Sequence, residues 1–164
     1  TDIYIGNDFH ENDYLYLNNG DKTFTESIAS AFAHTTQFSM GVDMADMNND
    51  GLMDVFTTDM LPWMEDVLLK SAGEDTDQVK KIKTDLGFET QHARNHFQVN
   101  NNDGTFSDIA YMTKTFATDW SWSVLLQDFD ANGHNDIFIS NGIARRPNDL
   151  DYINYLNEID NKKE

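Results

Sequence analysis

Short runs of β-branched and aromatic residues alternate with clusters of Asn, Asp and Gly along most of the chain. This pattern is typical of short strands joined by tight turns. The segments 18–21 (Asn-Asn-Gly-Asp) and 100–104 (Asn-Asn-Asn-Asp-Gly) hold residues that tolerate positive φ, so each is predicted to close a β-hairpin. One unit then reads strand, acidic loop, strand, connection, strand, Asn/Gly turn, strand. The predicted unit is therefore a four-stranded antiparallel sheet of about 50 residues, the size of a propeller blade.

The chain repeats itself at an offset of 82 residues. Two acidic loops match at this offset, and the same register pairs the two Asn/Gly turns. A third, partial copy begins at Asp2, 52 residues before Asp54, so the middle copy holds an insertion of 30 residues. The pairs within the loops are Asp46 with Asp128, Asn48 with Asp130, Asp50 with Asn132, Gly51 with Gly133, and Asp54 with Asp136.

The insertion lies between Asp59 and Asn95 and has helical features. Pro62 suits a first helical position and Gly73 suits a helix end. Two short helices are predicted there, the second because apolar residues follow helical spacing at Val79, Ile82 and Leu86.

We predict an all-β fold with a small helical insertion, built from blades of a β-propeller. The expected parts are a partial blade over 1–30, a blade over 38–110 with the insertion at 60–94, a partial blade over 119–148, and a C-terminal helix or tail over 149–164. A propeller needs at least about four blades to close. The chain is therefore expected to be a fragment of a larger propeller, and the alternative is that other chains supply the remaining blades.

The first acidic loop (residues 46–54) and the second acidic loop (residues 128–136) have the spacing of a calcium-binding loop. Oxygen-bearing side chains stand at positions 1, 3, 5 and 9, Gly at position 6 permits a sharp turn, and a main-chain oxygen at position 7 adds a ligand. Such hard oxygen donors suit Ca²⁺ better than zinc or copper. Two Ca²⁺ sites are predicted, with Asp46, Asn48, Asp50, Leu52 and Asp54 in one and Asp128, Asp130, Asn132, His134 and Asp136 in the other.

Two other interpretations of these loops were weighed. Asp, Asn and Gly also cluster in solvated turns that bind nothing, but two copies in one register disfavour that interpretation. An EF-hand loop needs a ligand at position 12 and a helix after it. Position 12 is Thr57 in one loop and Ile139 in the other, and both loops run into strand-like segments. The EF-hand interpretation therefore fails.

Charge and composition exclude several classes of protein. The 29 acidic and 11 basic residues give a formal charge of −18, which repels phosphate backbones, so nucleic acid is not an expected partner. No stretch approaches the roughly 18 apolar residues of a membrane span, so direct membrane insertion is not expected. The absence of cysteine excludes disulfides and thiolate sites. The first residues do not resemble a signal peptide, as expected for a mature or excised fragment.

The sequence resembles the FG-GAP/VCBS repeat family, whose integrin-like β-propellers bind calcium in Asp-rich hairpin loops. It is most similar to the secreted bacterial branch related to cartilage acidic protein and the ASPIC/UnbV proteins. The resemblance implies that the residues of the two acidic loops are calcium ligands and that Asp2 is the last ligand of a third loop. The matching stretches are residues 2–9, 13–20, 38–46, 58–62 and 119–123.

Few residues outside the loops indicate chemistry. His34 and His96 have no carboxylate or nucleophile at a telling spacing, so ordinary surface or core histidines are favoured over catalytic ones. Three tryptophans, Trp63, Trp120 and Trp122, are candidates for stacking on a sugar ring. Trp120 and Trp122 were expected to face opposite sides of a strand, with at least one packed between blades. No catalytic residue can be named, although distant carboxylates can still form an acid/base pair.

These observations predict a non-catalytic, calcium-stabilised module for recognition or scaffolding in an exported bacterial protein. The expected location is extracellular, at the outer-membrane surface or periplasmic, and the expected partners are a protein or a glycan together with the remaining blades. One alternative is a propeller in a carbohydrate-active enzyme or glycan-uptake assembly. The other is integrin-like adhesion through the insertion at 60–94, because insertions on a rigid scaffold often carry function.

Overall fold

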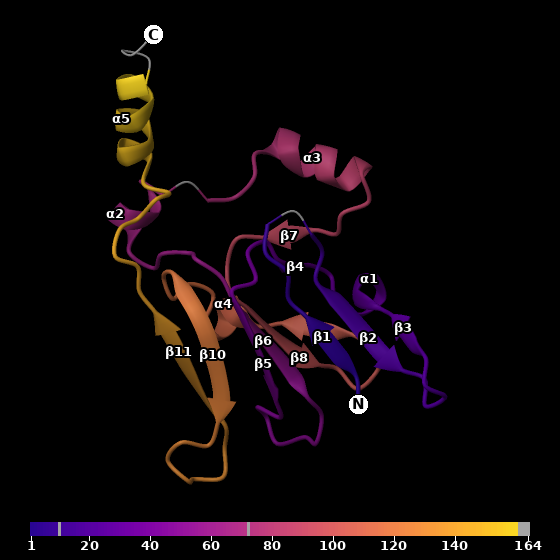
Figure 1. The fold of residues 1–164 in the computed structure, drawn as a ribbon. Coiled ribbons are helices and arrows are strands. Elements are labelled where there is room, and N and C mark those ends of the chain that lie inside the picture. The colour runs from indigo at the N-terminus through magenta and orange to yellow at the C-terminus, as the bar shows by residue number, and fades with distance from the viewer. Residues whose placement is uncertain (10, 72, 161–164) are drawn as a thin grey trace.

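The computed structural model describes residues 1–9, 11–71 and 73–160 and contains three antiparallel sheets that lie side by side (Figure 1). The N-terminal sheet consists of β1 (Ile3–Ile5), β2 (Tyr14–Asn18) and β3 (Phe24–Glu26). The central sheet has the order β5 (Gly41–Ala45), β6 (Asp54–Thr58), β8 (His96–Asn100), β9 (Phe106–Asp108). The C-terminal sheet pairs β10 (Ser121–Gln127) with β11 (Asp136–Asn141). The fold is all-β with short helices and forms a propeller-like fragment.

The register of the strands repeats at the same offset as the sequence. β5 pairs with β6 so that Ala45 faces Asp54, and β10 pairs with β11 so that Gln127 faces Asp136. Each acidic loop therefore connects the first two strands of a sheet. The predicted hairpins at the Asn/Gly turns are also present, because β2 pairs with β3 and β8 with β9.

Two apolar clusters hold neighbouring sheets together. Between the N-terminal and central sheets, Tyr4 packs with Val42 and Met44 in a cluster that includes Leu15 and Phe32. Between the central and C-terminal sheets, Phe56 packs with Val124 and Leu126, which are the repeat equivalents of Val42 and Met44. An aromatic residue on the second strand of one sheet thus contacts alternate residues on the first strand of the next. Burying each such side chain contributes about 2–3 kcal/mol.

The helices lie outside the sheets. α1 (Ile28–Ala31) and α4 (Ala110–Thr113) are repeat equivalents that follow the last strands of the N-terminal and central sheets. The short strands β4 (Thr35–Thr36) and β7 (Gln91–His92) pair in parallel. The insertion holds α2 (Glu65–Leu68) and α3 (Asp77–Asp85). α5 (Leu150–Asp160) lies within the predicted C-terminal helix or tail, of which residues 161–164 fall outside the described residues.

The limits predicted for the first helix of the insertion were wrong. α2 starts three residues after Pro62 because Met64 is extended, with ψ 123°, and Glu65 and Asp66 supply the acidic first turn that a helix N-terminus favours. It ends well before Gly73, because the chain turns there into a bridge between Ser71 and Asp149. None of the helices in the described part of the chain has the length and apolar character that a bilayer span requires.

Candidate metal centres

The first acidic loop is built around the side chain of Asp46. Its Oδ1 accepts a hydrogen bond from the N–H of Asp50 at 3.0 Å, and its Oδ2 accepts one from the N–H of Gly51 at 2.8 Å. Asp50 Oδ1 accepts from the N–H of Leu52 at 2.8 Å. Gly51 has φ +87°, a conformation that glycine adopts without strain, so the turn follows directly from the local sequence.

The second acidic loop repeats these hydrogen bonds one for one. Asp128 Oδ1 accepts from the N–H of Asn132 at 3.0 Å, and Asp128 Oδ2 accepts from the N–H of Gly133 at 2.8 Å. Asn132 Oδ1 accepts from the N–H of His134 at 2.8 Å, and Gly133 has φ +89°. The Gly133 N–H is the main cause that lowers the pKa of the Asp128 carboxyl. Both loops therefore hold their first aspartate ionised and turned into the loop.

The loops differ at position 9. Asp54 is fully buried, and its two oxygens accept from the N–H groups of Met47 at 3.0 Å and Asn100 at 2.9 Å. Asp136 is only half-buried and accepts from the N–H of Phe129 at 3.1 Å through Oδ2. The difference arises because Asn100 lies on β8, the third strand of the central sheet, whereas the C-terminal sheet has two strands among the described residues.

Only one loop brings three carboxylates together within the described part of the chain. Oxygens of Asp128, Asp130 and Asp136 lie within 4.8 Å of one another. Ca²⁺ binds oxygens at about 2.3–2.6 Å, so ligands across the ion are separated by up to about 5 Å and the spacing fits. The first loop replaces one of these carboxylates with Asn48, and the buried Asp54 is already fully hydrogen-bonded. Its predicted ligands therefore surround a less open centre.

The two acidic loops also contact each other. Asn49 Nδ2 donates to the main-chain oxygen of Gly133 at 3.1 Å and lies 2.8 Å from Nδ1 of His134. Asn135 Nδ2 donates to the main-chain oxygen of Asp46 at 2.8 Å. Both loops lie at the same end of their sheets (Figure 1). The predicted ligand residues Leu52 and His134 belong to this shared end.

Comparison with known families agrees with this geometry. Residues 1–57 match the family model described as an FG-GAP-like repeat, and the match includes β1 to most of β6 and the whole first acidic loop. The chain carries an FG-GAP-like repeat. The repeat implies a β-propeller-type module, and FG-GAP-like repeats commonly bind Ca²⁺ and typically occur in extracellular proteins. No curated protein matches the chain.

A second polar cluster surrounds Asp108 and was missed by sequence reasoning. Asp108 Oδ2 lies 2.9 Å from His34 Nε2, 2.9 Å from His96 Nδ1 and 2.7 Å from the guanidinium of Arg94. Burial alone would raise the pKa of Asp108, but hydrogen bonds from both histidines and from a backbone N–H hold it well below its usual range. Burial lowers the pKa of His96 to about 4, so this histidine is neutral at pH 7.

This arrangement corrects the interpretation of His34 and His96 as histidines without a carboxylate partner. His34 is 74 residues from Asp108, so no local spacing could reveal the pair. The two histidines and Asp108 place three ligand atoms within 4.8 Å, as a metal site would. However, Arg94 already neutralises Asp108 and its guanidinium lies 4.5 Å from the centre of the Tyr111 ring. We therefore assign the cluster to joining β8, β9 and the segment before β4.

The three candidate tryptophans are not equivalent. Trp63 and Trp122 are exposed, at 69% and 50%, and the indole N–H of Trp122 donates to the main-chain oxygen of Gly142. The rings of Trp120 and Trp122 lie 6.2 Å apart, so the expectation of opposite faces was wrong. Residues two apart in a strand share a face. The three rings do not form one aromatic platform, because Trp63 belongs to the insertion.

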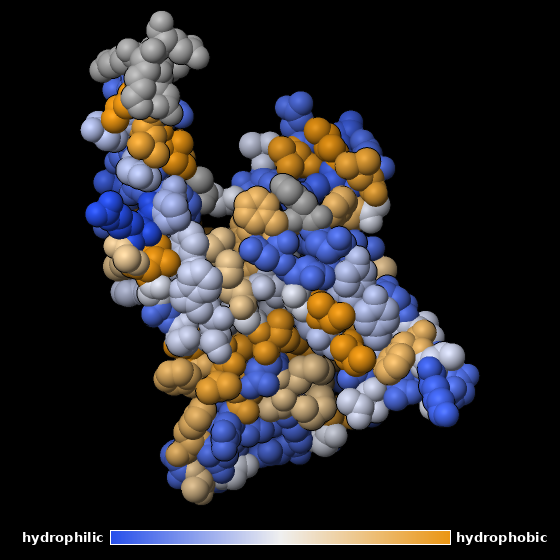
Figure 2. Space-filling view, viewed as in Figure 1, coloured by the Kyte–Doolittle hydropathy of each residue, from blue (hydrophilic) through white to orange (hydrophobic). Residues whose placement is uncertain are grey.

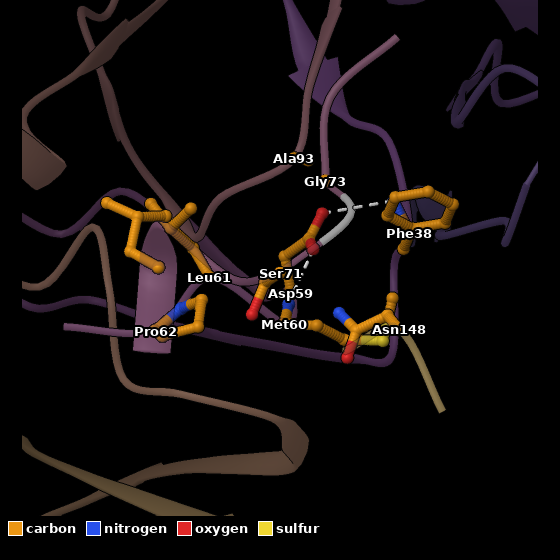
Figure 3. Close-up of a pocket in the computed structure, with 10 residues that line it drawn as sticks. Phe38, Asp59, Met60, Leu61, Pro62, Ser71, Gly73, Ala93 and Asn148 are labelled. Atoms are coloured by element: carbon orange, nitrogen blue, oxygen red, sulfur yellow. Dashed lines mark hydrogen bonds between the residues drawn. The ribbon is translucent and has the colours of Figure 1, made fainter. Parts of the chain in front are cut away.

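A small pocket lies at the end of the sheets opposite the acidic loops, beside Asp59 (Figure 3). Leu61, Pro62 and Phe38 are among the apolar residues that line it. Burial raises the pKa of the Asp59 carboxyl to about 7, against hydrogen bonds from the N–H groups of Met60 and Phe38. The carboxyl is thus held by the backbone and carries no partner that would mark it as an acid/base pair.

Proposed function

We propose that the chain is a calcium-stabilised β-propeller-type module that serves recognition or scaffolding rather than catalysis in an exported or cell-surface bacterial protein. The observation that supports it is the second acidic loop, where three carboxylates converge within the diameter of a calcium coordination shell. The first acidic loop, which repeats its hydrogen bonds, supports a second site. No pair of carboxylates and no nucleophile with a base stands out among the described residues to support an enzyme.

The mechanism follows from charge. Asp128, Asp130 and Asp136 would hold the ion in the second loop, with Asn132 and the main-chain oxygen of His134 completing the set. A divalent cation supplies the positive charge that offsets the repulsion between these carboxylates. Because the unfolded chain does not hold these groups together, binding stabilises only the folded state. The contact between the two loops would then fix the edge shared by the central and C-terminal sheets.

Recognition through exposed aromatic side chains is a second candidate, supported by Trp63. Its side chain is 69% exposed and stands in the insertion, beyond the sheets. A glycan or a protein is the expected ligand of such a residue. A Trp63→Ala variant should lose binding on a glycan array if sugar is the ligand, and deletion of the insertion should abolish partner binding if a protein is. Retained binding in both variants would eliminate this candidate.

Thermal unfolding with and without chelator tests the calcium proposal. If Ca²⁺ binds only the folded state at a concentration about 100-fold above its Kd, removing it should lower the melting temperature by about 5 °C or more. Adding Ca²⁺ back should restore the transition, and Mg²⁺ at equal concentration should restore less. An Asp77→Asn variant, with one carboxylate fewer on α3, should respond like the unaltered chain. An unchanged melting temperature after chelation would refute the proposal.

A further inference from the structure

In the two sheets that have a third strand, that strand is fastened to the second by the same side-chain contact. In the N-terminal sheet the backbone N–H of Asn18 donates to Oδ1 of Asp2 at 2.8 Å. In the central sheet the backbone N–H of Asn100 donates to Oδ1 of Asp54 at 2.9 Å. Asn100 is the repeat equivalent of Asn18, so the contact is a property of the unit.

The start of the third strand is fastened in the same repeated way. The N–H of Asn7 donates to Oδ1 of Asp13 at 2.8 Å, and the N–H of Asp59 donates to Oδ1 of Asn95 at 2.8 Å. Asp13 and Asn95 are also repeat equivalents, and each stands five residues before the Asn that ends its strand. A third strand of this unit is therefore marked by Asp or Asn, four residues, and then Asn.

The C-terminal sheet has the acceptor for such a strand but not the strand. β11 pairs with β10 alone, and among the described residues no donor reaches Oδ1 of Asp136, the equivalent of Asp54. Phe138 is 54% exposed whereas its equivalent Phe56 is fully buried. Apolar residues are exposed over this sheet on the face shown in Figure 2. An open edge beside exposed apolar residues is a ready template for another strand.

We propose that the free edge of β11 docks an extended segment, supplied by polypeptide outside residues 1–164, that carries Asp or Asn at its start and Asn five residues later. The segment runs antiparallel to β11 and donates the N–H of its Asn to Oδ1 of Asp136. A second copy of this chain is a poor donor because its two strands of this type, β2 and β8, already pair with β1 and β6. The inference rests on the propeller-type module proposed above and does not require calcium.

A synthetic peptide with the sequence of residues 12–26, which includes both marker residues and the β2–β3 hairpin, tests the proposal. The peptide is added at millimolar concentration to isotope-labelled chain 1–164, and amide hydrogen exchange is followed by NMR with Ca²⁺ and with chelator. We expect exchange at residues 136–141 to slow at least about tenfold, because a strand edge becomes paired. The other free edges, at β3 and β9, should not respond.

A matched peptide N-methylated at the position of Asn18 lacks only the N–H that reaches Asp136. It should bind about tenfold more weakly, as expected for the loss of one hydrogen bond to a charged group. No protection of residues 136–141 in either condition, equal binding of both peptides, or protection at β3 or β9 instead would overturn the inference. Failure of the calcium proposal is read separately, from an unchanged melting temperature with chelator.

Discussion

The first acidic loop lies on a sheet of four strands and the second on a sheet of two, although their own hydrogen bonds are the same. In the central sheet the position-9 aspartate is buried between strands and both of its oxygens are used. In the C-terminal sheet the same residue keeps one oxygen without a donor among the described residues and faces its two loop carboxylates. The local sequence thus determines the loop, and the neighbouring strand determines how open its cation site is.

The largest expected contrast is between the equivalent aromatic residues of the two sheets. Phe56 is fully buried between sheets, so Phe56→Ala should lower the free energy of unfolding by about 4 kcal/mol through lost burial and a cavity. Phe138 is half exposed, so Phe138→Ala should cost under about 1 kcal/mol. Urea unfolding monitored by circular dichroism measures both. Similar losses would mean that the C-terminal sheet is covered in solution.

The position-9 aspartates should differ next. In chelator, Asp54→Ala should lower the free energy of unfolding by about 3 kcal/mol, because it leaves the N–H groups of Met47 and Asn100 buried without an acceptor. Asp136→Ala removes one half-exposed hydrogen bond and should cost about 1 kcal/mol. The same urea titration, in chelator, is the measurement. A larger loss for Asp136→Ala would reverse the comparison.

A smaller contrast concerns pH, because the central sheet buries Asp59 where the C-terminal sheet has the exposed Asn141. The folded-state pKa of Asp59, about 7, lies above its ordinary value of 3.8, so the folded chain binds this proton more tightly than the unfolded chain. This contribution to stability is complete below about pH 4 and is lost as pH rises towards 7, on the order of 2 kcal/mol.

Unfolding free energies of the Asp59→Asn variant from pH 4 to 7 test this contribution. The part of the pH dependence that comes from Asp59 should disappear, and the reverse change at the exposed equivalent, Asn141→Asp, should add none. His96 acts in the opposite direction, since its pKa of about 4 makes the folded chain lose stability as pH falls below about 6.5. A pH profile that is identical with and without Asp59 would contradict its buried, proton-binding state.

Much of this fold could be predicted from the sequence because its determinants are local and repeated. Gly51 and Gly133 fix the loop turns, the Asn/Gly clusters fix the hairpins, and the offset of 82 residues sets the order of the strands. The irregular parts were harder, since α2 starts after Pro62 and ends through a bridge to Asp149, a residue far along the chain. The cluster around Asp108 was missed for the same reason, because His34 reaches it across 74 residues.

The ligand residues were easier to predict than their environment. Spacing alone selected Asp54 and Asp136 as equivalent, because both follow a Gly by three residues and precede a strand. Their burial differs because β8, which begins 42 residues after Asp54, returns to pair with β6. Such a return depends on tertiary pairing and not on the loop sequence.

The most direct test is a calcium titration by calorimetry on metal-free chain 1–164 and on the variants Asp46→Ala and Asp128→Ala. Each substitution removes the first aspartate of one loop and leaves the other loop intact. We predict two ions bound per chain, one lost with each substitution, and tighter binding at the more open second loop. Fewer than one ion bound per chain, or a stoichiometry that neither substitution lowers, would contradict the assignment of the acidic loops as calcium sites.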